Sequence, residues 1–205
     1  MTPLKSEQPV FLIVAGPNGS GKSSVYLDAD LEWDGRSVWI VNPDLLAARI
    51  QEVEGGPLRD ANLTAVIRIE QWLEASIDVH KTIGVETVLS TDKYRRLVVK
   101  AKKLNFLVWM IYVVLDSPDR SIERIKFRIA KGGHAVADDD VRRRYWKSLN
   151  QFQWFADQAD RAWFYDNSGA KPRQVGEKID GVITAAEDTM PTLLAAIRAI
   201  EDKRL

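Results

Sequence analysis

The chain has 205 residues, and its 29 lysines and arginines balance 29 aspartates and glutamates, so the formal net charge is zero. A balanced charge gives no overall attraction to nucleic acid or to an anionic membrane surface, so any basic site must be local. The absence of cysteine excludes disulfides and thiolate chemistry. With His80 and His134 as the only histidines, the sequence argues against a multi-histidine metal site.

The length and a hydrophobic content of 45% are typical of one globular domain. We therefore expect a single domain over residues 1–205, with a loose polar tail at residues 1–9. The longest apolar run, residues 106–115, is too short to span a bilayer. No signal peptide is visible, so we expect a cytoplasmic protein without a membrane partner.

The first predicted strand, Val10 to Ala15, is a continuous apolar run that leads into a glycine-rich loop and then a helix from Ser23 to Ala29. The loop fits the pattern G-x-x-x-x-G-K-[ST] of a phosphate-binding P-loop. A chance glycine turn would not require this order of strand, loop and helix. The residues expected to bind nucleotide are Gly16, Pro17, Asn18, Gly19, Ser20, Gly21, Lys22, Ser23 and Ser24.

Each part of this loop has a predicted chemical role. The glycines allow backbone N–H groups to approach phosphate oxygens, and the start of the following helix adds partial positive charge. The Lys22 ammonium can reach the β- and γ-phosphates, and the Ser23 hydroxyl can bind Mg²⁺. The sequence therefore predicts ATP and Mg²⁺ as cofactors, with Ser23 as the metal ligand.

After the loop, predicted strands and helices alternate along the chain. The expected strands lie at residues 38–41, 85–89, 106–115 and 162–165. Helices are expected at residues 43–52, 92–104, 117–131 and 191–203. A further helix is expected to carry an apolar stripe from residue 66 to 77, and another to begin at residue 138. Asp92 and Asp138 are expected to cap their helices, and Asp180-Gly181 is expected to turn a β-hairpin. This alternation predicts an α/β fold with a mostly parallel sheet and helices on both faces.

Acidic residues lie at or near the ends of three predicted strands. Asp44 either accepts the proton of an acceptor hydroxyl facing the γ-phosphate, or complements the dipole of a helix start. Glu86 lies inside an apolar strand, where an acid is costly to bury without a partner, so it is a candidate to hold Mg²⁺ through water or to bind substrate. Asp116 ends the fourth strand, which resembles a Walker B strand, and its alternative role is that of a turn acid ahead of the helix start at Ser117-Pro118.

Basic residues are concentrated between two predicted helices joined by Gly132-Gly133. The cations are Arg120, Arg124, Lys126, Arg128, Lys131, Arg142, Arg143, Arg144 and Lys147. Basic helices with a glycine hinge suit a lid over triphosphate, which we place at about residues 126–145. The alternative is a solvated basic face. Nucleic-acid binding is a weaker interpretation because aromatic residues are absent from the centre of the cluster.

Several of these motifs, in this order, resemble the zeta-toxin-like family of P-loop kinases over roughly residues 10–170. The motifs are Gly16 to Ser23, Asn42-Pro43-Asp44, Glu86-Thr87, Gly132-Gly133-His134, Arg143-Arg144-Tyr145 through Ser148-Leu149, and Asp166-Asn167-Ser168. The chain is similar to the stand-alone chromosomal branch of that family. The resemblance implies a nucleotide-kinase-like three-layer sandwich with a small helical lid.

The resemblance also implies roles for individual residues. Asp44 would be the base on the acceptor hydroxyl, and Glu86 would be a substrate-side carboxylate, with Thr87 and Thr91 nearby. Arg128 and one of the pair Arg143 and Arg144 would bind phosphate. The implied acceptor is a sugar nucleotide such as UDP-N-acetylglucosamine, and an antitoxin protein becomes a candidate partner.

We therefore expect an ATP-dependent kinase that moves the γ-phosphate of ATP to a hydroxyl of a small acceptor. The proposed catalytic residues are Lys22, Asp44, Arg128, Arg143 and Arg144. The alternatives are a kinase for another hydroxylated metabolite, a non-catalytic nucleotide-dependent switch or ATPase, and a phosphotransferase directed at nucleic acid.

Overall fold

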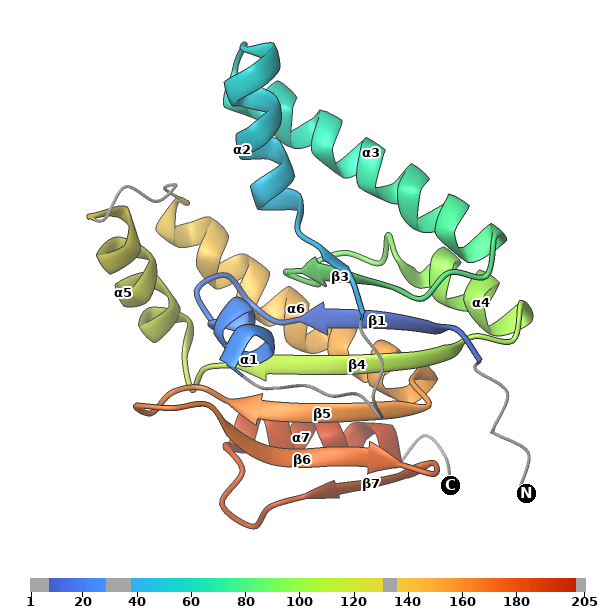
Figure 1. The fold of residues 1–205 in the computed structure, drawn as a ribbon. Coiled ribbons are helices and arrows are strands. Elements are labelled where there is room, and N and C mark those ends of the chain that lie inside the picture. Colours follow the sequence, from blue (N-terminus) through green and yellow to red (C-terminus); the bar gives the residue numbers. More distant parts are fainter. Residues whose placement is uncertain (1–7, 29–37, 131–135, 202–205) are drawn as a thin grey trace.

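The computed structural model describes residues 8–28, 38–130 and 136–201, and Figure 1 shows their fold. Its strands form a seven-stranded sheet in the order β2-β3-β1-β4-β5-β6-β7. The strands are β1 (Val10–Ala15), β2 (Ile40–Val41), β3 (Ile83–Thr87), β4 (Leu107–Val114), β5 (Arg161–Asp166), β6 (Arg173–Ile179) and β7 (Val182–Ala185). The helices are α1 (Lys22–Asp28), α2 (Pro43–Glu54), α3 (Leu58–Asp78), α4 (Arg95–Lys103), α5 (Pro118–Ile129), α6 (Asp138–Gln158) and α7 (Pro191–Glu201).

The sheet is parallel from β2 to β5, and β6 and β7 add an antiparallel edge. Strand β1 lies between β3 and β4, so the chain leaves β1 toward one edge of the sheet and later returns to its other side. Ligands of open α/β sheets bind at such a reversal, outside the carboxyl ends of the strands. In Figure 1 the arrowheads of β1, β4 and β5 point toward α1 and α5 at this end.

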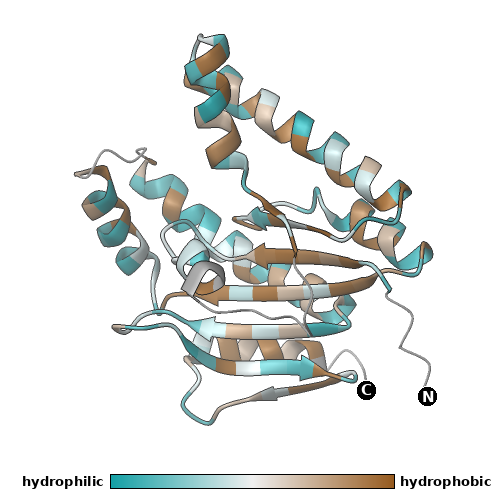
Figure 2. Ribbon diagram, viewed as in Figure 1, coloured by the Kyte–Doolittle hydropathy of each residue, from teal (hydrophilic) through white to brown (hydrophobic). Residues whose placement is uncertain are grey.

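Strand β1 is buried on both faces, which explains its uninterrupted apolar sequence. Phe11, Ile13 and Ala15 face a large core shared with α3, α4, α6 and α7. The alternate residues of β1 pack on the opposite face, against Val25 of α1. Figure 2 shows the resulting hydrophobic band along β1 and β4. The predicted α/β fold with a mostly parallel sheet and helices on both faces is confirmed.

The β6–β7 hairpin also forms as predicted. Asp180 has a φ of 50° and Gly181 a φ of 81°, so both turn residues are left-handed. This is the backbone that a two-residue type I′ hairpin turn requires.

Several predicted boundaries were wrong. Helix α4 begins at Arg95 with Tyr94 at its N-cap and no side-chain cap, so Asp92 does not cap it. Asp138 is the first residue of α6 rather than its cap. Strand β3 starts and ends two residues earlier than the predicted range 85–89. It cannot extend to residue 89 because Leu89 adopts a left-handed φ of 58°.

Parts of other predictions fall outside the described residues. These parts are residues 1–7 of the predicted tail, the end of the predicted helix at Ala29, Gly132-Gly133-His134 and the chain after Glu201. Gln8 and Pro9 are described: the Gln8 side chain donates to Asn105 Oδ1 at 2.8 Å, and the Pro9 carbonyl accepts from Leu107 N at 2.9 Å.

Helices α2 and α3 pair as an arm that rises from the edge of the sheet in Figure 1. The arm has a small core of its own, formed by Ala47, Ile50, Ala61 and Ala65. Strand β2, which leads into α2, is only two residues long. The arm therefore joins the body through a short strand at its beginning and through the base of α3 at its end.

The base of α3 is tied to α4 by ion pairs of Glu74, and these give a pH prediction. Hydrogen bonds from Arg96 and Lys100 lower the pKa of Glu74 from 4.5 to about 2. A lowered carboxyl pKa stabilises the fold above the unfolded pKa, and this contribution is lost as the pH falls toward the folded pKa. Glu74→Gln should be less stable than wild type at pH 7, with the difference shrinking between pH 4.5 and about 2.

Urea denaturation midpoints across this pH range would measure the effect. Glu187→Gln, which changes an exposed acid between β7 and α7, is the control. A stability difference that does not change with pH would contradict the assigned ion pair.

Candidate active site

The glycine loop between β1 and α1 has the backbone that a phosphate cradle needs. Gly16, Gly19 and Gly21 have φ values of 146°, 73° and 81°. A Cβ atom on Gly16 would lie 1.9 Å from the Val113 carbonyl oxygen of β4. Both the dihedral angle and the space therefore require glycine at this position.

Lys22 is the charged centre of the site. Its side chain is buried, and its Nζ donates to the carbonyls of Gly16 at 3.0 Å and Pro17 at 3.2 Å. Glu86 Oε1 lies 3.9 Å from the same nitrogen. Burial lowers the pKa of Lys22 and outweighs the nearby carboxylates, which raise it. The loop thus folds around the ammonium that the sequence assigned to phosphate binding.

Glu86 of β3 connects the loop to a second element. Its Oε2 accepts hydrogen bonds from Ser23 Oγ at 3.1 Å and from Asn42 Nδ2 at 2.9 Å. The β1–β3 register places Glu86 beside Val14, one residue before the end of β1. The half-buried acid that looked costly in the sequence is therefore satisfied from the P-loop on one side and from the start of α2 on the other.

Asp44 and Arg128 lie close enough to affect Lys22. The charge of Asp44 raises the pKa of Lys22, and the charge of Arg128 lowers it. Asp44 is an exposed residue in the first turn of α2, and Arg128 is in the last turn of α5. The acid and the arginine of the predicted transfer site therefore both act electrostatically on the same buried lysine.

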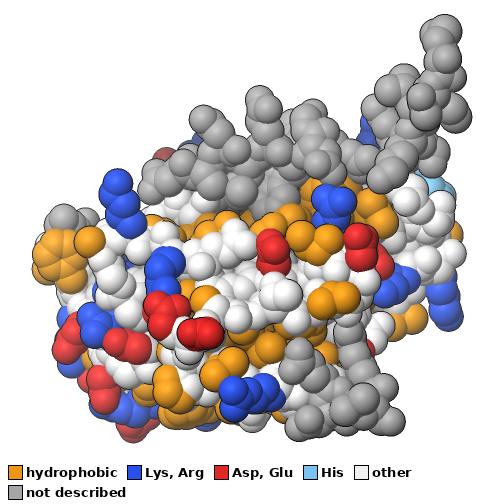
Figure 3. Space-filling model, turned by 90° about the horizontal axis from the view of Figure 1, so that it is seen from below, with side chains coloured by type: hydrophobic (Ala, Val, Ile, Leu, Met, Phe, Trp, Pro, Cys, Tyr) orange, Lys and Arg blue, Asp and Glu red, His pale blue; other side chains and the backbone are white. Residues whose placement is uncertain are grey.

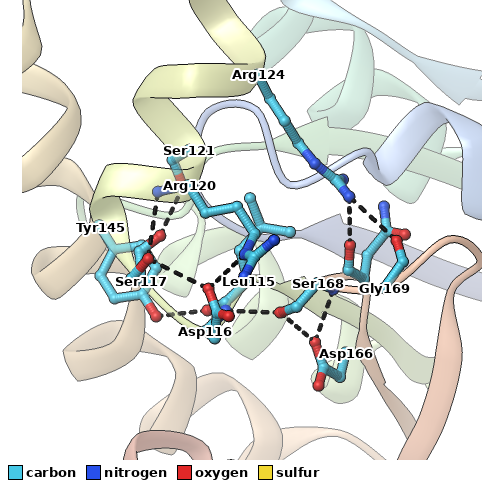
Figure 4. Close-up of polar contacts among 11 residues, drawn as sticks. Leu115, Asp116, Ser117, Arg120, Ser121, Arg124, Tyr145, Asp166, Ser168 and Gly169 are labelled. Carbon is cyan, nitrogen blue, oxygen red and sulfur yellow. Dashed lines mark hydrogen bonds and ion pairs between the residues drawn. The ribbon is translucent and has the colours of Figure 1, made fainter.

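Asn167 and Arg124 support the other side of the loop. Asn167, directly after β5, is buried, and its Nδ2 donates to the Ser20 carbonyl at 2.8 Å. Arg124 Nη2 donates to the Asn167 carbonyl at 2.7 Å and lies 3.5 Å from the Gly169 carbonyl (Figure 4). The Asn167 hydrogen bond therefore joins the P-loop to the end of β5, and Arg124 of α5 holds the segment that carries Asn167.

Asp116 takes part in the same network and behaves as a turn residue. Its carboxylate accepts from Arg120 Nε at 2.8 Å and from Ser117 Oγ at 3.2 Å (Figure 4). The hydrogen bond from Arg120 lowers the pKa of Asp116. Its backbone N–H donates to Ser168 Oγ at 2.8 Å. Of the two alternatives, the structure favours the acid at a helix start.

The remaining predicted substrate residues differ in their surroundings. Thr87 is buried, and its Oγ1 accepts from Leu89 N at 3.1 Å. Its carbonyl accepts from Gly16 N at 3.2 Å, which joins β3 to the loop. Thr91 is exposed in the segment between β3 and α4. Their substrate roles stay predictions.

The arginines at the start of α6 have different partners. Arg142 pairs with Asp119 of α5, and Arg143 pairs with Asp140 one turn earlier on α6. Arg144 is half-buried. The hinge of the predicted lid, Gly132-Gly133-His134, lies outside the described residues, so the lid stays a prediction.

Sequence analysis assigned no individual site role to Asn42 or Asn167 and placed Arg124 only in the basic cluster, although the structure makes each a partner of the site. Asn42 and Asn167 were visible only as members of motifs. Their contacts are remote in the chain: Asn42 and Glu86 are 44 positions apart, and Asn167 and Ser20 are 147 positions apart. Only the strand order brings them together.

The residues present fit a magnesium ion bound together with a nucleotide. Ser23 supplies a hydroxyl, Glu86 a carboxylate, and Mg²⁺ typically adds phosphate oxygens and waters to such a small protein set. Within the described ranges, no group of three or more histidine, aspartate and glutamate side chains could hold a metal by itself. Nor is any described helix long and apolar enough to cross a membrane.

Comparison with known proteins identifies the family and structures with a similar fold. The family model described as zeta toxin matches residues 2–170. An uncharacterised protein of Haemophilus influenzae is 27% identical over 134 residues, which cover 65% of this chain and 91% of the relative.

Solved structures share the fold. The PezAT chromosomal toxin–antitoxin system of Streptococcus pneumoniae superposes with a TM-score of 0.63 at 14% identity, covering 98% of this chain and 88% of that one. The AvrRxo1-ORF1:-ORF2 complex with ATP gives 0.58 at 15% identity, covering 97% and 65%. A kinase-like protein of Chloroflexus aurantiacus gives 0.53 at 21% identity, covering 66% and 75%.

The Gly16 geometry gives a test of the loop. Gly16→Ala should abolish binding of Mg²⁺–ATP, because the new Cβ would overlap the Val113 carbonyl and the residue could not keep its φ of 146°. Isothermal titration calorimetry with a non-hydrolysable ATP analogue would measure binding.

Gly169→Ala is the matched control, since its nearest contact would be the Lys171 carbonyl at 3.9 Å. Unchanged nucleotide affinity in Gly16→Ala would show that this loop does not hold the phosphates.

Proposed function

The chain belongs to the zeta toxin family, and from this premise we propose that it is an ATP-dependent kinase that phosphorylates a hydroxyl of a small acceptor. One observation carries the proposal: Lys22 and Ser23 of the P-loop are joined through Glu86 and Asn42 to the helix that carries Asp44. A phosphate donor site and a carboxylate suited to an acceptor hydroxyl are thus parts of one connected site.

On the donor side, the P-loop amides and Lys22 would hold the phosphates of ATP. The Ser23 hydroxyl donates a hydrogen bond to Glu86, so the lone pairs of the Ser23 oxygen stay available to a cation. A bound Mg²⁺ would neutralise charge on the β- and γ-phosphates. Lys22 would exchange its contacts with the Gly16 and Pro17 carbonyls for contacts with phosphate oxygens.

On the acceptor side, Asp44 would accept the proton of the attacking hydroxyl. The acceptor oxygen forms a bond to the γ-phosphorus, the bond from that phosphorus to the bridging oxygen of ADP breaks, and the proton moves to the carboxylate. Arg128, together with Arg143 or Arg144, would neutralise charge on the transferred group. The nearness of Arg128 to Lys22 supports this role.

The family suggests finer assignments for the acceptor and partner. We propose a sugar nucleotide of the UDP-N-acetylglucosamine type as the first acceptor to test, with Glu86, Thr87 and Thr91 on the acceptor side. Two structural neighbours are described as complexes with a second protein, one of them a toxin–antitoxin system, which supports an antitoxin as a candidate partner. A cytoplasmic location, where ATP is available, completes the proposal.

A phosphotransferase directed at nucleic acid is less well supported. On the side seen in Figure 3, basic and acidic side chains are interspersed rather than gathered by sign. In the basic segment, Arg120, Lys126, Arg142 and Arg143 each form an ion pair with an aspartate. Such pairing reduces the positive field that attracts a phosphate backbone.

Two substitutions separate the donor and acceptor roles. Lys22→Ala should abolish nucleotide binding or turnover, because it removes the cation at the phosphates. Asp44→Asn should keep ATP affinity and lower kcat by about 10²–10⁴-fold, the usual contribution of a general base. A screen of sugar nucleotides and small hydroxyl compounds with ATP, read by mass spectrometry, would identify the product.

Asp60→Asn is the control for Asp44→Asn, since Asp60 is an exposed acid in the first turn of α3. Full activity of Asp44→Asn toward the true acceptor would show that Asp44 is not the base. ATP binding without any acceptor, together with a tight protein partner, would instead favour a nucleotide-dependent switch.

A toxin role has a separate test in growing cells. Expression of the wild-type chain should arrest growth, and Lys22→Ala should relieve the arrest, since it removes the phosphate contact. Growth curves after induction would measure this, with expression levels matched by immunoblot. Equal arrest by both proteins would exclude phosphotransfer as the cause.

A further inference from the structure

We propose that Asn42 is a positioning residue that couples the nucleotide side of the site to helix α2, and so to Asp44. The inference rests on the proposed function, because it assumes that nucleotide binds at the P-loop. It adds a residue and a physical connection to that function: occupancy of the phosphate site is transmitted to the helix that carries the proposed base.

Both polar atoms of the Asn42 side-chain amide form hydrogen bonds. Its Nδ2 donates to Glu86 Oε2 at 2.9 Å. Its Oδ1 accepts from the backbone N–H of Asp44 at 2.9 Å and of Leu45 at 3.3 Å. One amide group therefore joins strand β3 to the first turn of α2.

The connection continues into the P-loop. The oxygen of Glu86 that accepts from Asn42 also accepts from Ser23 Oγ at 3.1 Å. A shift of Ser23 when phosphate and cation bind must move or reorient this carboxylate oxygen. Because Asn42 donates to the same oxygen, the change in Glu86 is passed to α2 through direct hydrogen bonds.

Helix capping alone does not explain why position 42 is an asparagine. Asparagine, aspartate and serine cap helices about equally well, since each offers a side-chain oxygen. Of these, only asparagine also supplies a neutral donor that reaches Glu86. Aspartate would bring a second carboxylate to an oxygen that now accepts at 2.9 Å, and serine is too short to replace the amide nitrogen.

The way α2 is attached to the sheet makes the contact between Asn42 and Glu86 important for the position of α2. The arm formed by α2 and α3 packs around its own small core, and β2, which precedes α2, is only two residues long. Pro43 follows Asn42 directly and fixes its own φ, so a change at Asn42 is carried into the first turn rather than absorbed by the backbone. Asp44 lies in that turn.

The test compares wild type with Asn42→Ser, which keeps the cap and removes the bond to Glu86. Amide hydrogen exchange is followed with and without Mg²⁺ and a non-hydrolysable ATP analogue. In wild type the nucleotide should slow exchange in both the P-loop and residues 43–54. In Asn42→Ser the P-loop effect should remain and the effect on residues 43–54 should disappear. The thermal midpoint should fall only by the cost of one lost hydrogen bond.

A second substitution at the same position removes the contact by charge repulsion. Asn42→Asp keeps a capping oxygen and should also uncouple α2, because two carboxylates then face each other. Asn62→Ser, on the exposed side of the same arm, is the control and should behave as wild type.

The outcomes distinguish this inference from the proposed function. An Asn42→Ser protein whose residues 43–54 respond to nucleotide as in wild type would show that Asn42 is only a cap. Absence of any P-loop response in wild type would overturn the proposed nucleotide site, and the coupling with it. Once an acceptor is known, Asn42→Ser should lower kcat on the order of 10²-fold with little change in the KM for ATP, as expected for a misplaced base.

Discussion

Burial of the Lys22 ammonium is the constraint on which the rest of the site depends. A cation removed from water must find compensating oxygens, or the fold loses several kcal/mol. The carbonyls of Gly16 and Pro17 provide two partners, which requires the loop to turn back around the side chain. Glu86 provides the opposing charge, which requires β3 to lie beside β1 in a fixed register. The turn of the loop and the position of the half-buried acid thus both satisfy one buried charge.

Local signals in the sequence were sufficient for the frame of the molecule. The apolar run of β1, the glycine pattern after it and the Asp180-Gly181 turn each act within a few residues, so periodicity and turn chemistry identify them. The start of α4 shows where local rules fail. Asp92 has the side chain of a good cap, but Tyr94 is buried in the core, and that packing fixes where the helix begins.

Contacts that cross the sheet could not be predicted in the same way. Asn167 reaches Ser20 because β5 and β1 both flank β4, a neighbourhood set by the order of the whole sheet. The sequence also showed a basic cluster without its partners. Four of its cations pair with Asp116, Asp138, Asp119 and Asp140, which lie on or beside the same helices. Charge runs in a sequence therefore overstate the free positive charge of the folded chain.

The two sides of the P-loop are held in different ways, and the difference matches the proposed donor and acceptor roles. On the β5 side, Asn167 binds the Ser20 carbonyl and is itself held by Arg124, and these contacts to backbone carbonyls do not depend on a ligand. On the α2 side, the contact runs through side chains that a bound phosphate and cation would engage directly, Ser23 and then Glu86. Asp44, the proposed base, is exposed, so an acceptor must displace solvent around its carboxylate before a proton can be transferred. A rigid donor side combined with a ligand-responsive acceptor side would bring that base into place only when nucleotide is bound, which limits transfer of the phosphate to water.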